Sequence, residues 1–221
     1  NKLMFNLKKN SGRNNTGKIV IKNRGGGNKY KLRFIDYKRY LYIPAIILKQ
    51  ENIKKNSATI ALILYKNGLL SYIISAHNLK IGTIINNNIS FIGSNLLLKH
   101  AFVGSIIYNV ETIPGNGAQF ARAAGSFCQI INLFKYKNKL LILIRLKSKK
   151  EYILDKECNC VFGIASYLFF KYYKPYTKAG QRRIKGSRPH VRGVAMNPID
   201  HPHGGNTSGG RCSISIYGVL A

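Results

Sequence analysis

Residues 57–76 read SATIALILYKNGLLSYIISA, two apolar runs that are separated by Lys66, Asn67 and Gly68. An Asn-Gly pair between apolar runs is a strong signal for a β-hairpin, because both residues accept the positive φ that its tight turn requires. The same interruption excludes a membrane helix, which needs about 20 apolar residues in succession. The stretch therefore predicts two antiparallel strands.

Apolar runs of the same kind continue on both sides of this hairpin. They are rich in Ile, Leu and Tyr and are separated by clusters of Asn, Gly and Lys, a pattern typical of strands and turns. The further runs are residues 43–48, 81–85, 103–108, 127–133 and 140–146. We expect a second hairpin around residues 135–139, and an all-β fold of two small barrels that join near residues 86–95.

Few segments favour a helix. The best candidate is the Ala-rich residues 118–124, and residues 166–173 fit a helix or a strand. The cysteines have neither the spacing of a disulfide framework nor that of a zinc knuckle. We therefore expect free thiols, buried or partly exposed, at Cys128, Cys158, Cys160 and Cys212.

The chain carries an extreme positive charge. Lys and Arg number 36 against 7 acidic residues, which gives a formal net charge of +29. The two ends of the chain hold much of this positive charge. Residues 1–39 contain 12 basic residues and one acidic residue, and residues 177–221 contain seven basic residues and one acidic residue. Such a charge repels itself unless a polyanion neutralises it, so it excludes an ordinary cytosolic enzyme and points to nucleic acid or an anionic membrane.

The C-terminal region differs in composition from the rest of the chain. Gly, Arg, Pro and Ala supply 17 of the 35 residues in 177–211, and residues 180–205 read GQRRIKGSRPHVRGVAMNPIDHPHGG. This composition predicts an extended, irregular arm that a partner orders, since it forms neither a packed core nor a long helix. Its arginines suit bidentate phosphate contacts, and its glycines allow a close backbone approach or a positive φ.

Asp200, His201 and His203 suggest three kinds of chemistry. An imidazole beside a carboxylate can act as a general base, and a His-x-His pair can bind a metal ion. The sequence shows no nucleophile in a recognisable setting and no carboxylate pair. We favour RNA hydrogen bonding and locking of the loop, with metal contact and catalysis as lesser alternatives.

The N-terminal region repeats the mixture of glycine and basic residues, as GRNNTGK at 12–18 and RGGGNKYKLRFIDYKR at 24–39. The triple glycine lacks the Lys-Ser/Thr ending of a nucleotide-binding phosphate loop, which favours an RNA-facing turn between strands. Tyr30, Phe34 and Tyr37 can stack on bases, although core packing explains Phe34 equally well. Residues 103–127 contain Pro114 and several glycines and form a weaker candidate for a second RNA-facing loop.

Together these segments resemble the large-subunit ribosomal L-two family over nearly the whole chain. The matching segments are 12–18, 24–39, 57–68, 104–125 and above all RPHVRGVAMNPIDHPHGG at 188–205. The resemblance implies a basic N-terminal arm at 1–18, an OB-type rRNA-binding barrel at 19–92, a Src-homology-3-like barrel at 93–173 and an extended Gly/Pro/Arg-rich arm at 174–221. The resemblance is looser after Gly205, and compared with the family pattern we expect most of the long N-terminal extension and of the basic C-terminal tail to be lacking.

The resemblance also implies a function. We expect a structural constituent of the large subunit, not an enzyme, that binds large-subunit rRNA near the peptidyl-transferase centre and supports subunit association and translation. The expected partners are that rRNA, neighbouring ribosomal proteins and the small subunit; we expect no membrane span, no metal site and no cofactor beyond Mg²⁺ associated with rRNA. Asp200, His201 and His203 match a loop suspected of a direct part in peptide-bond formation.

The amino-acid composition suggests the kind of genome that encodes the chain. Asn, Ile, Lys, Tyr and Phe, whose codons are AT-rich, make up 100 of the 221 residues. Such a bias is typical of organellar genomes, so we expect a mitochondrial protein, with a plastid or relict plastid as the alternative. A stand-alone RNA-annealing module and an enzyme that uses His201 remain the competing hypotheses.

Pattern and resemblance together assign a set of residues to rRNA binding. They are Arg13, Asn14, Asn15, Lys18, Arg24, Gly25, Gly26, Gly27, Lys29, Lys38, Arg39, Gln119, Arg122, Lys178, Arg182, Arg183, Lys185, Arg188, Arg192, Met196, Asn197, Asp200, His201, His203, Gly204, Gly205 and Arg211. No residue is assigned to catalysis or to a metal ion.

Overall fold

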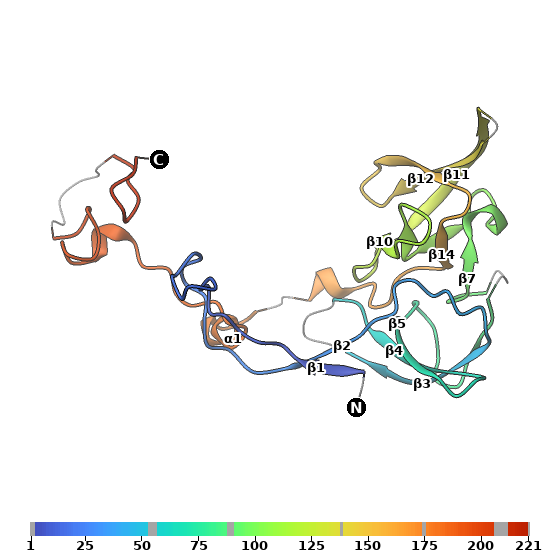
Figure 1. Cartoon of the computed structure of the whole chain (residues 1–221), viewed down its shortest axis with the longest axis horizontal. Coiled ribbons are helices and arrows are strands. Elements are labelled where there is room, and N and C mark those ends of the chain that lie inside the picture. The colour runs from blue at the N-terminus through green and yellow to red at the C-terminus, as the bar shows by residue number, and fades with distance from the viewer. Residues whose placement is uncertain are drawn as a thin grey trace. The chain divides into compact units, whose positions relative to one another are not determined.

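A computed structural model describes residues 3–52, 57–87, 91–137, 139–173, 176–205 and 212–220 (Figure 1). The chain divides into two compact units. The first, here called the β unit, is Asn1–Leu7 with Tyr30–Lys174, and the second, the end unit, is Lys8–Lys29 with Pro175–Ala221. Among the described residues, no helix is long and apolar enough to cross a membrane.

The first sheet of the β unit contains the predicted Asn-Gly hairpin. Its strands are β3 (Ala45–Glu51), β4 (Ile60–Tyr65), β5 (Leu70–Ile74) and β6 (Ile84–Ile85), all antiparallel, in the order β5-β4-β3-β6. At the turn Gly68 has a φ of +83°, and the N–H of Tyr65 donates to the carbonyl of Leu69 at 2.9 Å. A separate pair, β1 (Met4–Asn6) with β2 (Lys31–Arg33), was not predicted.

The second sheet has six strands in the order β13-β12-β11-β8-β14-β7. They are β7 (Asn95–Leu97), β8 (Ile106–Tyr108), β11 (Cys128–Tyr136), β12 (Lys139–Leu146), β13 (Glu151–Asp155) and β14 (Asn159–Phe162). The predicted second hairpin is confirmed, since Tyr136 pairs with Lys139 across it, and Figure 1 shows β11 and β12 as its two long arms. A short pair, β9 (Val110–Glu111) and β10 (Ala118–Phe120), completes the strands.

The two sheets share part of one hydrophobic core. Tyr108 and Val161 of the second sheet pack with Ile63 and Ile73 of the first, and the buried hydroxyl of Tyr108 donates to the carbonyl of Ile74 at 3.1 Å. Such curled antiparallel sheets fit an OB-type barrel followed by a Src-homology-3-like barrel, so the all-β prediction is confirmed. The boundaries at residues 18, 92 and 173 remain predictions.

The helix predictions were less successful. Residues 118–124 do not form a helix: Ala118 begins β10, where its buried N–H donates to the carbonyl of Tyr37 at 3.0 Å. Tertiary pairing has overridden the helix propensity of alanine. Residues 166–173, left open between helix and strand, include the 3-10 helix η2 (Phe170–Tyr172).

Three other helical segments were not anticipated. One α-helix, α1 (Ala179–Ile184), and one 3-10 helix, η3 (Gly193–Ala195), lie in the arm that we predicted to be extended and irregular, without a long helix. A further 3-10 helix, η1 (Leu98–His100), follows β7.

The four thiols are free, as predicted, but they differ in exposure. Cys128, Cys158 and Cys160 are buried, whereas Cys212 is exposed. Burial raises the pKa of the Cys128 and Cys158 thiols to about 12, which removes the reactive thiolate at neutral pH. We expect iodoacetamide to alkylate Cys212 alone in the folded protein and all four cysteines in denaturant, as peptide mass spectrometry would show. Rapid native labelling of Cys128 would contradict this burial.

Candidate nucleic-acid interface

The end unit joins two segments that lie about 160 residues apart in the sequence. Arg24 and Ser187 form an antiparallel bridge, and on either side the N–H of Gly25 donates to Gly186 O at 3.0 Å and the N–H of Arg188 donates to Asn23 O at 2.9 Å. We expected the ends to take their shape from a partner alone. The described contacts instead pair the two ends with each other.

The triple glycine explains why this pairing is close. A Cβ on Gly27 would lie 2.7 Å from the carbonyl oxygen of Ile184, too close for any side chain. Gly25, Gly26 and Gly27 run beside residues 184–186, and Gly26 and Gly27 are in the left-handed region, with φ of +64° and +74°. The RNA-facing turn between strands stays a prediction. The ammonium of Lys9 donates to Gly27 O at 2.7 Å, a contact that could not be predicted from the residue pattern.

A groove of about 760 Å³ lies within the end unit. Arg13, Arg24, Arg183 and Arg188 line it, and all four were assigned to RNA from the sequence. Guanidinium groups bind phosphate through paired N–H donors, and with one acidic residue against 14 basic ones in these two segments the groove attracts polyanions.

The same groove has an apolar lining. Met196, which was assigned to RNA, lies there with Ile19, Ile21, Val191 and Tyr217, which were not. The ammonium of Lys22 lies over the ring of Tyr217, at 5.9 Å from the ring centre. Such a groove suits a nucleic acid, because the guanidinium groups can bind its phosphates and the aromatic and aliphatic side chains can pack against its base faces.

The loop at residues 13–18 is organised by its own polar side chains. The side-chain oxygen Oδ1 of Asn14 accepts N–H groups from Thr16 at 3.1 Å and Lys18 at 2.9 Å, and the Arg13 guanidinium donates to Gly17 O at 2.8 Å. Asn14 therefore shapes the loop. Asn15 and Lys18 are exposed on it.

The His-rich loop is closely packed against itself. The N–H of His203 donates to Nδ1 of His201 at 3.0 Å, and His203 Nε2 lies 2.9 Å from Cys212 O. Partial desolvation, His203 and Lys22 lower the pKa of His201, which favours the neutral imidazole that this hydrogen bond requires. The N–H of Gly204 donates to His201 O at 2.8 Å, so backbone and side chains together hold the loop closed.

The packing of the His-rich loop requires a glycine at position 204, because a Cβ there would lie 2.2 Å from Asn197 O. We expect Gly204→Ala to open the loop and to remove the hydrogen-exchange protection of the amides of Gly204 and Gly205. The matched control is Gly180→Ala in α1, where nothing lies within 4 Å of an added Cβ and alanine should be neutral or slightly stabilising. Unchanged protection in the Gly204 variant would contradict the packing.

A second cluster of predicted residues lies in the β unit. Lys38, Gln119 and Arg122 are exposed. Lys38 lies in the loop after β2, Gln119 in β10 and Arg122 just after β10, and the hydrogen bond from Ala118 to Tyr37 brings these segments together. The Arg122 guanidinium lies 5.1 Å from the ring centre of Tyr37, and the Tyr40 hydroxyl donates to the carbonyl of Gly115. Asp36 holds the first loop by accepting the N–H of Lys38 at 3.0 Å.

Glu111 holds the second loop and was missed by the sequence analysis. Its side chain is fully buried and accepts three backbone N–H groups, from Gly117 at 2.9 Å, Asn159 at 3.0 Å and Gly115 at 3.2 Å. A carboxylate just before a Pro-Gly loop in a basic chain was an available signal. Glu111 therefore fixes the loop that precedes Gln119 and Arg122.

Arg39 does not belong to the exposed surface. It is 4% exposed, and its guanidinium donates to Gly93 O at 3.0 Å, while its own carbonyl accepts from the Asn95 amide at 3.0 Å. Burial of the guanidinium argues against the assignment of Arg39 to RNA. Its contacts join the loop after β2 to residues at the start of β7.

The other assigned residues lie outside these two clusters. Lys185 packs against Tyr176, with its ammonium 4.5 Å from the ring centre. Arg211 lies outside the described residues. Those that are exposed on the end unit are Lys29, Lys178, Arg182, Lys185, Arg192, Asn197, Asp200 and Gly205. Within the described ranges no three His, Cys, Asp or Glu side chains are grouped to hold a metal ion.

An all-β body with exposed cations and an arginine-lined unit built from both ends of the chain defines a nucleic-acid-binding protein. Two family models match the chain: "Ribosomal Proteins L2, RNA binding N-terminal domain" at residues 1–87 and "Ribosomal Proteins L2, C-terminal domain" at residues 91–217. The chain belongs to the ribosomal protein L2 family. It is accordingly a ribosomal protein and not an enzyme, as the sequence predicted.

Known relatives agree over almost the whole chain. The large ribosomal subunit protein uL2 of Wolbachia pipientis (subspecies Culex pipiens) is 43% identical over 98% of this chain and 80% of its own length. A protein of Reclinomonas americana called large ribosomal subunit protein uL2m is 42% identical, over 98% and 79%. The uL2 of Mycoplasmoides gallisepticum is 43% identical, over 92% and 73%.

Proposed function

We propose that this chain is a structural constituent of an organellar large ribosomal subunit, most simply the mitochondrial one, and that it binds large-subunit rRNA near the peptidyl-transferase centre. The observation that carries the proposal is the groove of the end unit, where four arginines meet an apolar lining. The excess of amino acids with AT-rich codons supports an organellar gene, and one relative is called uL2m, beside relatives called uL2 in bacteria.

In this proposal the two clusters have different roles. The groove and the His-rich loop bind folded rRNA, with Mg²⁺ ions that belong to the RNA, while the surface around Lys38 and Arg122 adds a second RNA contact. Neighbouring ribosomal proteins and the small subunit complete the partners and allow subunit association. A plastid or relict plastid is the alternative location.

Sucrose-gradient sedimentation of an organelle lysate tests the proposal. We expect the chain to sediment with large subunits and to leave them only in high salt or denaturant, because its phosphate contacts release counterions on binding. Isolation of mitochondria and plastids before lysis identifies the compartment. A chain found free of ribosomes would overturn the proposal.

His201 tests whether the His-rich loop acts in assembly or in peptide transfer. We infer an assembly role, because the imidazole is engaged with the N–H of His203. His201→Gln should then reduce the incorporation of the protein into large subunits. Normal assembly with abolished peptide transfer would instead favour a direct part in the chemistry.

A further inference from the structure

A cluster of exposed aromatic side chains lies at the end of the β unit, in a segment that the sequence analysis did not assign. Residues 167–173 read YLFFKYY, and five of the seven are aromatic. Tyr172 is 83% exposed, Tyr173 62% and Phe169 57%. A contiguous patch of exposed aromatic side chains usually marks a binding surface, because such side chains would otherwise be buried in the core.

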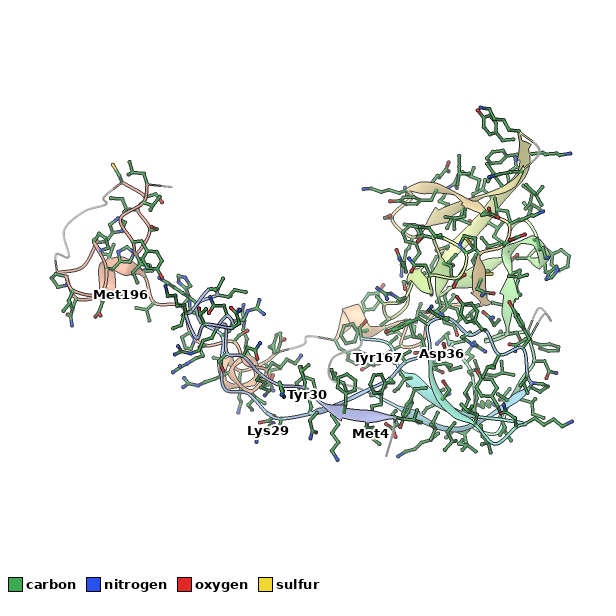
Figure 2. All side chains as sticks on the ribbon, in the orientation of Figure 1. Met4, Lys29, Tyr30, Asp36, Tyr167 and Met196 are labelled. Atoms are coloured by element: carbon green, nitrogen blue, oxygen red, sulfur yellow. The ribbon has the colours of Figure 1, made fainter. Side chains whose placement is uncertain are left out.

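The aromatic rings of this segment contact one another, and Tyr167 lies 5.5 Å from Phe170 between ring centres. Tyr167 and Tyr173 stack with ring centres 5.9 Å apart and planes 24° apart, while Phe169 and Tyr172 lie 6.0 Å apart. The segment starts from a fixed point: Ser166 is buried, its N–H donates to Ser75 O at 2.9 Å and its hydroxyl donates to Thr59 O at 3.1 Å. The aromatic segment therefore begins at a residue that is hydrogen-bonded to two other segments of the β unit, next to Tyr167, which Figure 2 labels.

A pocket of about 270 Å³ adjoins these rings. Tyr167, Phe169 and Tyr173 line it together with polar side chains, among them His77 and Asn78. Its volume is just below the range of about 300–1,000 Å³ for small-molecule sites, which suits one flat ring system better than a peptide segment. Polar groups beside an aromatic wall can bind the edge of a base whose face is stacked.

One residue of the pocket has an unusual backbone conformation. Tyr167 has a φ of +62°, in the left-handed region that is uncommon for a tyrosine. Such a conformation persists where the surroundings enforce it, often at ligand-binding positions. Asn78, at the same pocket, has a φ of +63°, which asparagine adopts readily.

We propose that residues 167–173 and the adjoining pocket form a stacking platform for unpaired nucleobases of RNA. The inference rests on the proposed rRNA-binding function. Nucleobases fit better than a protein partner because the chain's net charge of +29 attracts a polyanion, and because every base has a face that stacks on Tyr or Phe whatever the sequence. This contact depends on ring faces, so it adds affinity without adding charge.

Filter binding of the full-length protein to large-subunit rRNA, measured over a range of salt concentrations, tests the platform. Tyr172→Leu with Tyr173→Leu should weaken binding by roughly 5- to 150-fold, the equivalent of about 1–3 kcal/mol for one stacked base, and should leave the salt dependence unchanged. Tyr172→Phe with Tyr173→Phe should restore the affinity. The matched control is Tyr136→Leu, an exposed tyrosine at the β11–β12 hairpin, which should bind as the parent does.

Two results would overturn the platform and leave the proposed function intact. One is parental affinity in the double leucine variant while the parent binds rRNA normally. The other is a photoreactive phenylalanine analogue at position 172 that crosslinks in large subunits to a protein and not to a nucleotide, which would make the cluster a protein-docking surface. A parent protein without affinity for rRNA would overturn both proposals.

Discussion

Glu111→Ala is expected to destabilise the β unit by about 3–5 kcal/mol, a large part of the roughly 5–15 kcal/mol that holds a typical domain together. The substitution leaves three buried N–H groups, those of Gly115, Gly117 and Asn159, without their acceptor. Each unsatisfied buried donor costs on the order of 1–3 kcal/mol. Urea denaturation should show a lower transition midpoint with little change in slope.

Two further variants test whether the effect comes from the buried carboxylate of Glu111. One keeps the size of this side chain, and the other removes a carboxylate from the surface. Glu111→Gln keeps the shape but replaces one carboxylate oxygen by an NH₂ group that must face an N–H donor, so it should also destabilise, by at least about 1 kcal/mol. Glu157→Ala removes an exposed carboxylate and should change stability by less than about 0.5 kcal/mol. Equal midpoints for Glu111→Ala and Glu157→Ala would show that the buried acceptor is unimportant.

The strands could be predicted because their signals are local. Asn67 and Gly68 encode a turn whose geometry depends on two residues, and the apolar runs beside it need only a core on one side. Residues 118–124 failed for the opposite reason, since the partner of Ala118 is the carbonyl of Tyr37, about 80 positions earlier in the chain. No local propensity records such a contact.

The candidate site also contains residues that local signals could predict and residues that they could not. Arginine among glycines and prolines identified Arg13, Arg24, Arg183 and Arg188, because residue type and charge suffice to suggest phosphate binding. It also included Arg39, whose burial depends on Gly93 and Asn95 and is invisible in the sequence. The closeness of Gly27 to Ile184 could not be predicted either, because it requires the two ends of the chain to meet.

Replacing all four groove arginines, Arg13, Arg24, Arg183 and Arg188, with glutamine should weaken rRNA binding on the order of 10³-fold at 0.1 M salt. Each phosphate contact contributes about 0.7–0.9 to the slope of log affinity against log salt, so the slope should fall in magnitude by about 3–4. Filter binding of the full-length protein to large-subunit rRNA at several salt concentrations measures both quantities.

The control for this variant removes the same charge from another surface. Lys135, Lys139, Lys149 and Lys150 are exposed on the β11–β13 part of the β unit, and their replacement by glutamine lowers the net charge equally. If the groove binds rRNA, the lysine variant should lose much less affinity and salt dependence than the arginine variant. Equal losses would mean that rRNA responds to total charge alone. A fourfold Arg→Lys variant then separates charge from geometry: it should keep most of the salt slope but lose affinity, because lysine cannot form the paired N–H contacts of a guanidinium.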